Sequence, residues 1–259
     1  MSMYRKLLIS ALALLALASC TKETAVGDVQ ACFCACVSPD MAVFTKATGE
    51  PEPVVADKAV LQAWRGDVMA AEDVKAVTPG ETTVNFSGVK LAAGVEYDIY
   101  IMVYNDGYYE TSDLRSVSLS TDKAYDGKTP EFDAFYSCTT VTCGQNDEVH
   151  QVTLTRPFAK VSFSAAVEQN VTISYKAPTT LNLKTGEVSG ARNVEYTMQP
   201  AESSVIAFDY IFATEDVSQL AYTFRLGEEE KTTSIPVKRN AKTNIQYNKL
   251  IINNLLGGG

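Results

Sequence analysis

Histidine and tryptophan are almost absent from this chain, which has one of each among 259 residues. Catalytic triads usually take their base from histidine, so a hydrolytic set would depend on His150, beside Asp147 and Glu148. No Gly-x-Ser-x-Gly elbow, Walker loop, dinucleotide fingerprint or EF-hand pattern occurs. We therefore interpret His150 as a surface histidine at the start of a strand, and we expect neither an enzyme nor a cofactor.

Long apolar runs are also missing, apart from Leu7–Ala18. A helix of about 12 residues spans about 18 Å, less than the roughly 30 Å of hydrocarbon that a membrane span must cross. Arg5 and Lys6 precede this run and small residues follow it, an order typical of a secretory signal peptide. We therefore expect a leader at residues 1–19 that is removed from the mature chain.

The leader ends in Leu17-Ala18-Ser19-Cys20, which resembles a bacterial lipobox. In that motif, small residues let a signal peptidase cut before a cysteine that carries diacylglycerol. We therefore predict lipidation of Cys20 and attachment to the outer membrane through that lipid, because several acyl chains anchor a soluble domain firmly. An ordinary signal peptide with an incidental Cys20 is the alternative.

Basic residues are outnumbered by acidic ones. Without Arg5 and Lys6 of the leader, 20 basic residues face 31 acidic ones. Such a chain repels the phosphates of nucleic acid, so we expect no nucleic-acid partner. The excess acid is typical of a soluble, self-repelling surface.

Cysteines are few and unevenly spaced. Cys32, Cys34 and Cys36 would share one face of a strand, about 6.6 Å apart, and cannot easily bridge one another. No second ligand cluster with zinc spacing accompanies them, so we interpret them as half-buried strand residues and expect no metal site. Cys138 and Cys143 are a candidate disulfide in an oxidising compartment, and at least one thiol stays free or pairs outside the chain.

Period-two alternation of apolar residues dominates the remaining sequence and predicts an all-β chain, most simply built of sandwiches. One segment has Val95, Tyr97, Ile99, Ile101 and Val103 on its apolar face and Glu96, Asp98, Tyr100, Met102 and Tyr104 on the other. The same pattern predicts strands at residues 29–37, 60–64, 83–86, 114–119, 171–175 and 181–183. We expect a central strand at 205–213, a hairpin of 220–226 with 232–237, and one or two helical turns in "PEFDAFY".

The apolar face changes parity across Arg156-Pro157. Such a change needs a bulge or a crossing, and proline cannot donate a ladder hydrogen bond there. We therefore predict an N-terminal β-sandwich domain at residues 20–155 and a C-terminal one at 156–259. A single larger sandwich with a kinked strand is the alternative.

Several blocks resemble the fimbrillin-like lipoproteins of Bacteroidota, the type V pilin superfamily. They are the lipobox, "YDIYIMVYNDGYYETSDLRSV", "PEFDAFYS", "VTLTRPFAKVSFS", "PTTLNLKTGEVSG", "YIFA" and "PVKRNAKTNIQYNKL". The resemblance implies two transthyretin-like, Greek-key β-sandwich domains after a lipoprotein signal peptide, and display on the outer membrane at the cell surface or in a fimbrium. In pilin members an Arg-specific protease removes the first strand, and a strand of the next subunit fills the groove.

Carried onto this chain, the resemblance makes residues 29–37 the displaceable strand. Lys46 stands where many members place an arginine, and Arg65 is the nearest arginine, so these two are candidate processing positions. The donor strand would be 243–256. Its candidate anchors are Ile245, Tyr247, Leu250 and Ile252. A closing strand of their own domain is an equal interpretation of these residues.

The resulting hypothesis is a non-enzymatic, lipid-anchored fimbrial subunit or accessory adhesin. Its partners would be other fimbrial subunits and an unknown host or bacterial surface ligand. The rival is a carbohydrate-binding surface lipoprotein of a nutrient uptake system, with Trp64 and the "NDGYYE" tyrosines stacking on sugar rings.

Overall fold

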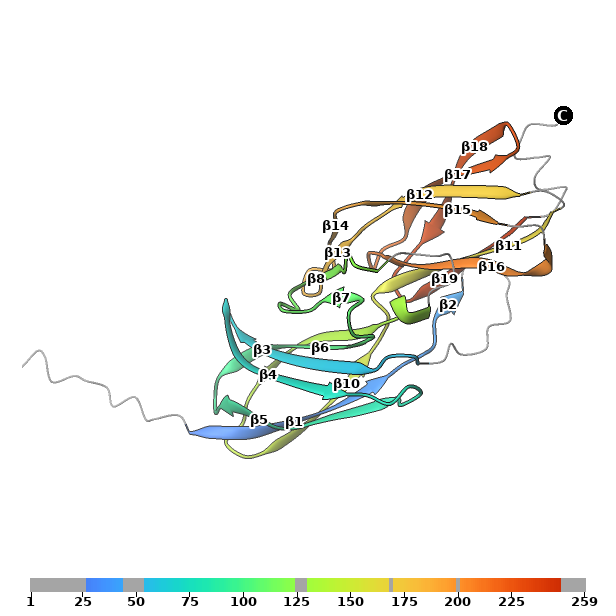
Figure 1. Ribbon diagram of the computed structural model, residues 1–259. Helices are drawn as coiled ribbons and strands as arrows, with labels where there is room; N and C mark the ends of the chain where they lie inside the picture. Colours follow the sequence, from blue (N-terminus) through green and yellow to red (C-terminus); the bar gives the residue numbers. More distant parts are fainter. Residues whose placement is uncertain (1–26, 44–53, 124–129, 168–169, 199–200, 248–259) are drawn as a thin grey trace, which may run out of the picture.

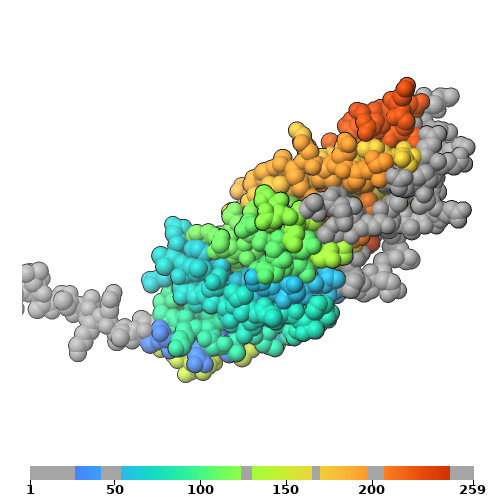
Figure 2. All heavy atoms as spheres, in the orientation of Figure 1, coloured from blue at the N-terminus to red at the C-terminus, as the bar shows by residue number. Residues whose placement is uncertain are grey.

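The computed structural model describes residues 27–43, 54–123, 130–167, 170–198 and 201–247. Within these ranges the regular elements are β-strands and a single 3-10 turn, η1, at Pro130–Phe132. The all-β prediction is confirmed, and η1 accounts for the turn expected in "PEFDAFY". The strands form an elongated molecule, with the N-terminal elements at one end and the C-terminal elements at the other (Figures 1 and 2).

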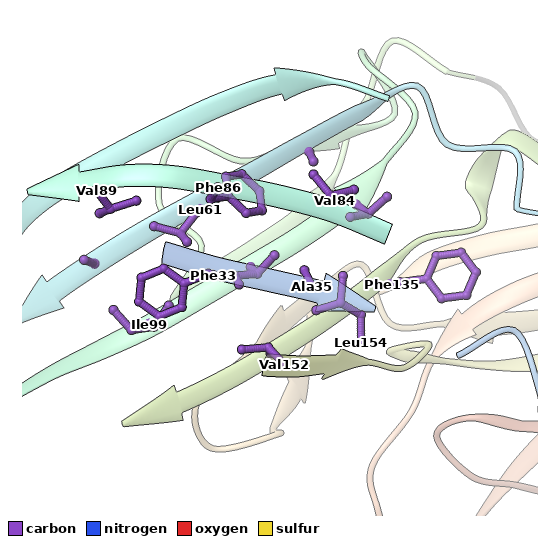
Figure 3. Close-up of a cluster of buried hydrophobic side chains, with 14 of the residues drawn as sticks. Phe33, Ala35, Leu61, Val84, Phe86, Val89, Ile99, Phe135, Val152 and Leu154 are labelled. Atoms are coloured by element: carbon purple, nitrogen blue, oxygen red, sulfur yellow. The ribbon is translucent and has the colours of Figure 1, made fainter. Parts of the chain in front are cut away.

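Two sheets enclose the first core. The three-stranded sheet has the order β10-β1-β5, and the four-stranded sheet has the order β4-β3-β6-β9. Their bounds are β1 (Asp28–Val37), β5 (Thr83–Ala92), β10 (Glu148–Leu154), β3 (Lys58–Arg65), β4 (Val68–Ala76), β6 (Glu96–Tyr104) and β9 (Phe135–Thr142). Apolar side chains of both sheets meet between them: Phe33, Phe86 and Val152 of the first face Leu61 and Ile99 of the second (Figure 3).

The second core lies between two further four-stranded sheets, of order β16-β11-β19-β2 and β15-β12-β17-β18. Their bounds are β2 (Ala42–Val43), β11 (Phe158–Val167), β16 (Ala201–Phe212), β19 (Ala241–Tyr247), β12 (Val171–Ala177), β15 (Arg192–Met198), β17 (Ser218–Leu226) and β18 (Glu229–Val237). Val161 and Phe163 of one sheet pack in the same cluster as Ile173 and Phe224 of the other. The fold is thus built of β-sandwiches.

A third apolar cluster joins the two sandwiches. It combines the outer face of β6 with the start of β11 and the end of β16, for example Tyr100 and Met102 with Phe158 and Phe212. A small sheet of order β14-β13-β8-β7 lies beside it, and its bounds are β7 (Tyr109–Glu110), β8 (Ser116–Leu119), β13 (Thr180–Asn182) and β14 (Val188–Ser189). The alternation correctly predicted strand β6 but not that both of its faces are covered.

The predicted strands are found, with one correction of position. The hairpin of β17 and β18 is present, with Gly227 in the left-handed region of its turn. The segment at 205–213, expected as a central strand, belongs to β16, which lies at the end of its sheet among the described strands. It is apolar because the third cluster covers its end, not because strands flank it on both sides.

The change of parity at Arg156-Pro157 is confirmed. Val152 and Leu154 belong to the first core, whereas Ala159 and Val161 belong to the second. The division into domains at this point stays a prediction, and two pairings cross it: Ala42 of β2 lies opposite Ala241 of β19, and Ser118 of β8 lies opposite Thr180 of β13.

We predict that the two faces of β1 differ sharply in their contribution to stability. Phe33 is 1% exposed and Cys36 points away from the core. Phe33→Ala should lower the free energy of unfolding by about 3–5 kcal/mol because it leaves a cavity. Cys36→Ala is the matched control and should change it by about 0.5 kcal/mol or less. Urea titration measures both, and equal losses would contradict the assignment of faces.

Candidate functional site

Strand β1 is the middle strand of its sheet. It pairs in parallel with β10, from Ala31 opposite Glu148 to Val37 opposite Leu154. On its other side it pairs antiparallel with β5, with a bulge between Ala31 and Phe33. Its inner face, including Phe33 and Ala35, lies within the first core (Figure 3). Removal of β1 would therefore leave two strand edges unpaired and expose apolar side chains.

The chain continues from β1 into the second sandwich. The amide of Ser38 donates a hydrogen bond to the carbonyl of Leu154 (2.9 Å), and β2 then pairs in parallel with β19. Residues 28–43 thus run as one path from the first sandwich to the second, which Figure 1 shows in blue. This segment contributes a strand to each of the two sandwiches.

A buried ion pair fixes the point where this path crosses between the sandwiches. The Arg156 guanidinium donates from Nε to Asp133 Oδ1 and from Nη2 to Asp133 Oδ2, both at 2.7 Å. The side chains are 0% and 1% exposed. Arg156 also donates to the carbonyl of Pro39 and lies over the ring of Phe135. Sequence reasoning used Arg156 only to mark a boundary and missed its role as a clamp on the β1–β2 path.

The candidate processing positions differ in what their cleavage would remove. Lys46 lies outside the described residues, in the segment between β2 and β3. Arg65 is exposed at the end of β3, and Gly66, in the left-handed region, turns the chain into β4. Cleavage after Arg65 would detach β3, which pairs with both β4 and β6.

The candidate donor segment is only partly described. Ile245 and Tyr247 lie in β19, which pairs in parallel with β11, with Tyr247 opposite Ala165. Ile245 packs against the second core. Leu250 and Ile252 lie outside the described residues. In the structure, therefore, residues 243–247 belong to a strand of the second sandwich, between β11 and β2.

Residues 35–254 match the protein family described as a family of unknown function, DUF6562. The chain belongs to this family. No curated protein sequence shows a significant match to it.

Several solved structures have a similar fold. One, from Bacteroides thetaiotaomicron, is a candidate polysaccharide-binding protein with a TM-score of 0.57 and 9% identity, covering 84% of this chain and 90% of that one. Another, from Parabacteroides distasonis, is a candidate cell adhesion protein with a TM-score of 0.54 and 12% identity, covering 85% and 88%. The fimbrial anchor protein Mfa2 of Porphyromonas gingivalis has a TM-score of 0.50 and 12% identity, covering 75% and 77%. At these identities, the similarity between this DUF6562 chain and the three solved structures establishes a shared fold.

The positions of the cysteines agree with the shared face predicted on β1 but not with the candidate disulfide. Cys32, Cys34 and Cys36 share the outer face of β1, as predicted, and Cys20 lies outside the described residues. Cys138 and Cys143 are both free. Strand β9 keeps the chain between them extended, so their Cα atoms are roughly 15 Å apart, whereas a disulfide needs about 4.4–6.8 Å. The expected disulfide is therefore absent from this conformation.

Three of the described thiols have raised pKa values and are therefore weak nucleophiles. Burial raises the pKa of the Cys138 and Cys143 thiols, and burial together with a hydrogen bond to Cys36 raises the pKa of Cys34. Raised pKa values keep a thiol protonated at neutral pH. Within the described ranges, His, Cys, Asp and Glu side chains form no group of three that could hold a metal ion.

His150 is not the surface histidine expected. It is the third residue of β10, and its ring stacks on Phe33 with centroids 5.0 Å apart. Its Nε2 atom lies 3.6 Å from Glu148 Oε2. The histidine is half-buried because the parallel register places it directly opposite Phe33 of β1. His150 therefore packs against β1, the candidate displaceable strand.

The aromatic residues proposed as sugar platforms are engaged in packing. Trp64 is 7% exposed, and the Arg115 guanidinium lies 3.7 Å from its ring centre. Tyr109 is buried and donates a hydrogen bond to the carbonyl of Phe132, while the ring of Tyr108 meets Phe132 edge-on. Trp64 and Tyr109 are therefore buried in packing contacts, which does not favour the rival hypothesis that they stack on sugar rings, whereas Tyr108 is half-buried. No helix in the described part of the chain has the length and apolar character needed to cross a bilayer.

We predict that breaking the Arg156–Asp133 pair destabilises the protein strongly. Arg156→Met removes the guanidinium that pairs with the buried Asp133 carboxylate and should lower the free energy of unfolding by about 3–5 kcal/mol. Lys58→Met is the control, since Lys58 pairs with Asp106 at the surface, and it should cost about 1 kcal/mol or less. In guanidinium titrations, the double variant Arg156→Met/Asp133→Leu should regain part of the loss, and a single-variant loss as small as the control's would contradict the clamp.

Proposed function

We propose that this protein is a lipid-anchored, fimbrillin-like surface protein that serves as a fimbrial subunit or accessory adhesin and assembles by β-strand addition. Two of the structures that share its fold are a candidate cell adhesion protein and a fimbrial anchor protein. That likeness supports a role in surface attachment or fimbrial assembly. The predicted lipid on Cys20 would hold the protein at the outer membrane.

The observation that carries the proposal is the placement of β1. A strand between β5 and β10 has hydrogen-bonding edges on both sides, and its buried face fills the first core. An incoming strand with the same alternation could replace both sets of contacts, with backbone pairing giving affinity and alternate side chains giving selectivity. An empty groove would expose unpaired strand edges and so promote aggregation. Removal of β1 must therefore be coupled to its replacement.

The same placement favours one processing position over the other. A cut near Lys46 would free residues 28–43 as one piece, including β1 and β2, and leave β3 in its sheet. A cut at Arg65 would also detach β3, whose Leu61 and Ala63 are 0% exposed. We therefore place maturation in the segment that contains Lys46 rather than at Arg65.

The C-terminal segment supplies the proposed donor. Ile245 packs in its own domain, so in the released chain the anchors farther along, Leu250 and Ile252, would enter the neighbour's groove. These two positions are two residues apart, the spacing that puts side chains on one face of a strand. Residues 243–247 would then stay with β11 and connect the subunits.

Processing can be tested by restoring the arginine. In Lys46→Arg, an Arg-specific protease should cut after position 46, release the N-terminal piece and yield ladders of oligomers that resist mild detergent. Lys90→Arg, in the intact strand β5, is the matched control and should give no such product. Mass spectrometry and gel electrophoresis read both out. Cleavage after position 46 that leaves only monomers would contradict assembly by strand addition.

Lipidation is tested separately. Wild-type protein should incorporate labelled palmitate and fractionate with the outer membrane, because acyl chains on one residue give stable membrane attachment. Cys20→Ala should lose both properties, while Cys36→Ala should keep them. Equal labelling of wild type and Cys20→Ala would refute the lipid anchor without bearing on strand addition.

A further inference from the structure

A polar cleft of about 340 Å³ opens between the two sandwiches. Strands β9 and β10 supply one wall, with Tyr136 and Thr153. The turn between β13 and β14 supplies another, with Lys184, and the loops around Glu215 and Arg239 complete it. The volume lies at the lower end of the roughly 300–1,000 Å³ of small-molecule sites, and such sites are common where domains meet.

Arg239 forms the floor of this cleft. Its side chain is 6% exposed, and its guanidinium donates to the carbonyl of Ala213 (3.0 Å), to the carbonyl of Gly186 (2.9 Å) and to the hydroxyl of Tyr136. A guanidinium has five N–H groups, so these bonds use three. Among the described residues, the other two have no acceptor within hydrogen-bond distance.

The charge on Arg239 is poorly neutralised. Its described carboxylate partner is Glu215, with Oε1 3.6 Å from Nη1, and the Glu215 side chain is 83% exposed. A buried cation is costly unless it is paired and hydrogen-bonded, and an exposed acid at this distance compensates it weakly. The two remaining N–H groups are the donors that the guanidinium can offer to a carboxylate brought in by a ligand.

The approach to Arg239 depends on Gly186. This glycine has a φ of +75°, and a Cβ atom there would lie 2.9 Å from Arg239 Nη2. The absence of a side chain lets the β13–β14 turn lie directly on the guanidinium, so the turn and the arginine form one rigid wall.

The mouth of the cleft adds a second cation and several hydroxyl groups. Lys184 is more than half exposed and forms an ion pair with Asp98. The hydrogen bond to Asp98 raises the pKa of Lys184, so its ammonium group stays charged at neutral pH. Hydroxyls come from the first sandwich and from the β13–β14 turn. They are Tyr136, Ser137, Thr153, Thr155 and Thr185.

We propose that this cleft binds an acidic sugar, a small polyhydroxylated carboxylate of the uronic-acid type. The carboxylate would accept hydrogen bonds from Arg239 and Lys184, and the ring hydroxyls would exchange hydrogen bonds with the threonine and serine side chains. The residues that line this cleft do not include Trp64 or Tyr108, the aromatic residues considered for sugar stacking from the sequence. It also goes beyond the proposed function, because it needs neither cleavage nor displacement of β1.

The test titrates the intact protein, purified in detergent, with sodium glucuronate, glucose and sodium acetate. Calorimetry and amide shifts follow binding. Glucuronate should bind saturably and shift the amides of Lys184–Gly186, while glucose and acetate should each bind at least about tenfold more weakly, since each offers only half of the contacts. Absence of saturable glucuronate binding by the folded protein, or equal binding of acetate, would overturn the proposal.

Two variants with matched controls locate the site. Lys184→Gln should weaken glucuronate binding about tenfold, whereas Lys231→Gln, at an exposed position of β18, should not. Glu215→Gln should strengthen binding about two- to fivefold because it removes a competing carboxylate, whereas Glu228→Gln in the β17–β18 turn should have no effect. Both variants alter exposed side chains, and circular dichroism verifies their folding. Unchanged affinity in both would overturn the proposal and leave strand addition unaffected.

Discussion

A buried ion pair between Arg156 and Asp133 holds the place where the chain passes from one sandwich to the other. Neither side chain reaches solvent, and in this setting the pairing of the two charges offsets part of the cost of burying them. The pair ties the segment after β10 to the segment before β9, and through the carbonyl of Pro39 it also holds the path from β1 to β2. The pair therefore links three segments of the chain at the junction of the two sandwiches.

Three of the sequence blocks meet around that pair. "PEFDAFYS" supplies Asp133 and Tyr136, the block "RPFAKV" begins with Arg156, and "RNAKTNI" begins with Arg239. Arg156 donates to Asp133 and Arg239 donates to Tyr136. Asn240, in the left-handed backbone region, accepts a hydrogen bond from the amide of Arg156 (3.4 Å). The blocks therefore have a structural reason to occur together, since they join the sandwiches and supply part of the wall of the cleft between them.

The contrast between the two faces of β1 relates this framework to function. The inner face, with Phe33 and Ala35, is part of a close-packed core, while the outer face carries three cysteines. A replacement strand must reproduce the inner face and is less constrained on the outer one. The clamp at Arg156 holds the end of β1, so release of the strand requires loss of the Pro39 contact as well as of the two ladders.

The local pattern of the sequence determined the strands. Alternation at 29–37, the two apolar runs at 220–226 and 232–237, and the change of parity at Arg156-Pro157 were sufficient to predict β1, the β17–β18 hairpin and the passage between cores. The reason is that side-chain direction in a strand has a period of two. The same rule predicted the shared face of Cys32, Cys34 and Cys36.

The tertiary structure decided which faces are covered and which distant groups meet. Tyr100 and Met102 are buried because β11 and β16 pack over the outer face of β6, and His150 is half-buried because of its register with Phe33. The pairs of Arg156 with Asp133 and of Arg239 with Tyr136 join residues 23 and 103 positions apart. Periodicity reports the direction of a side chain from its own backbone, whereas these contacts depend on how separate sheets stack, and no local pattern encodes that.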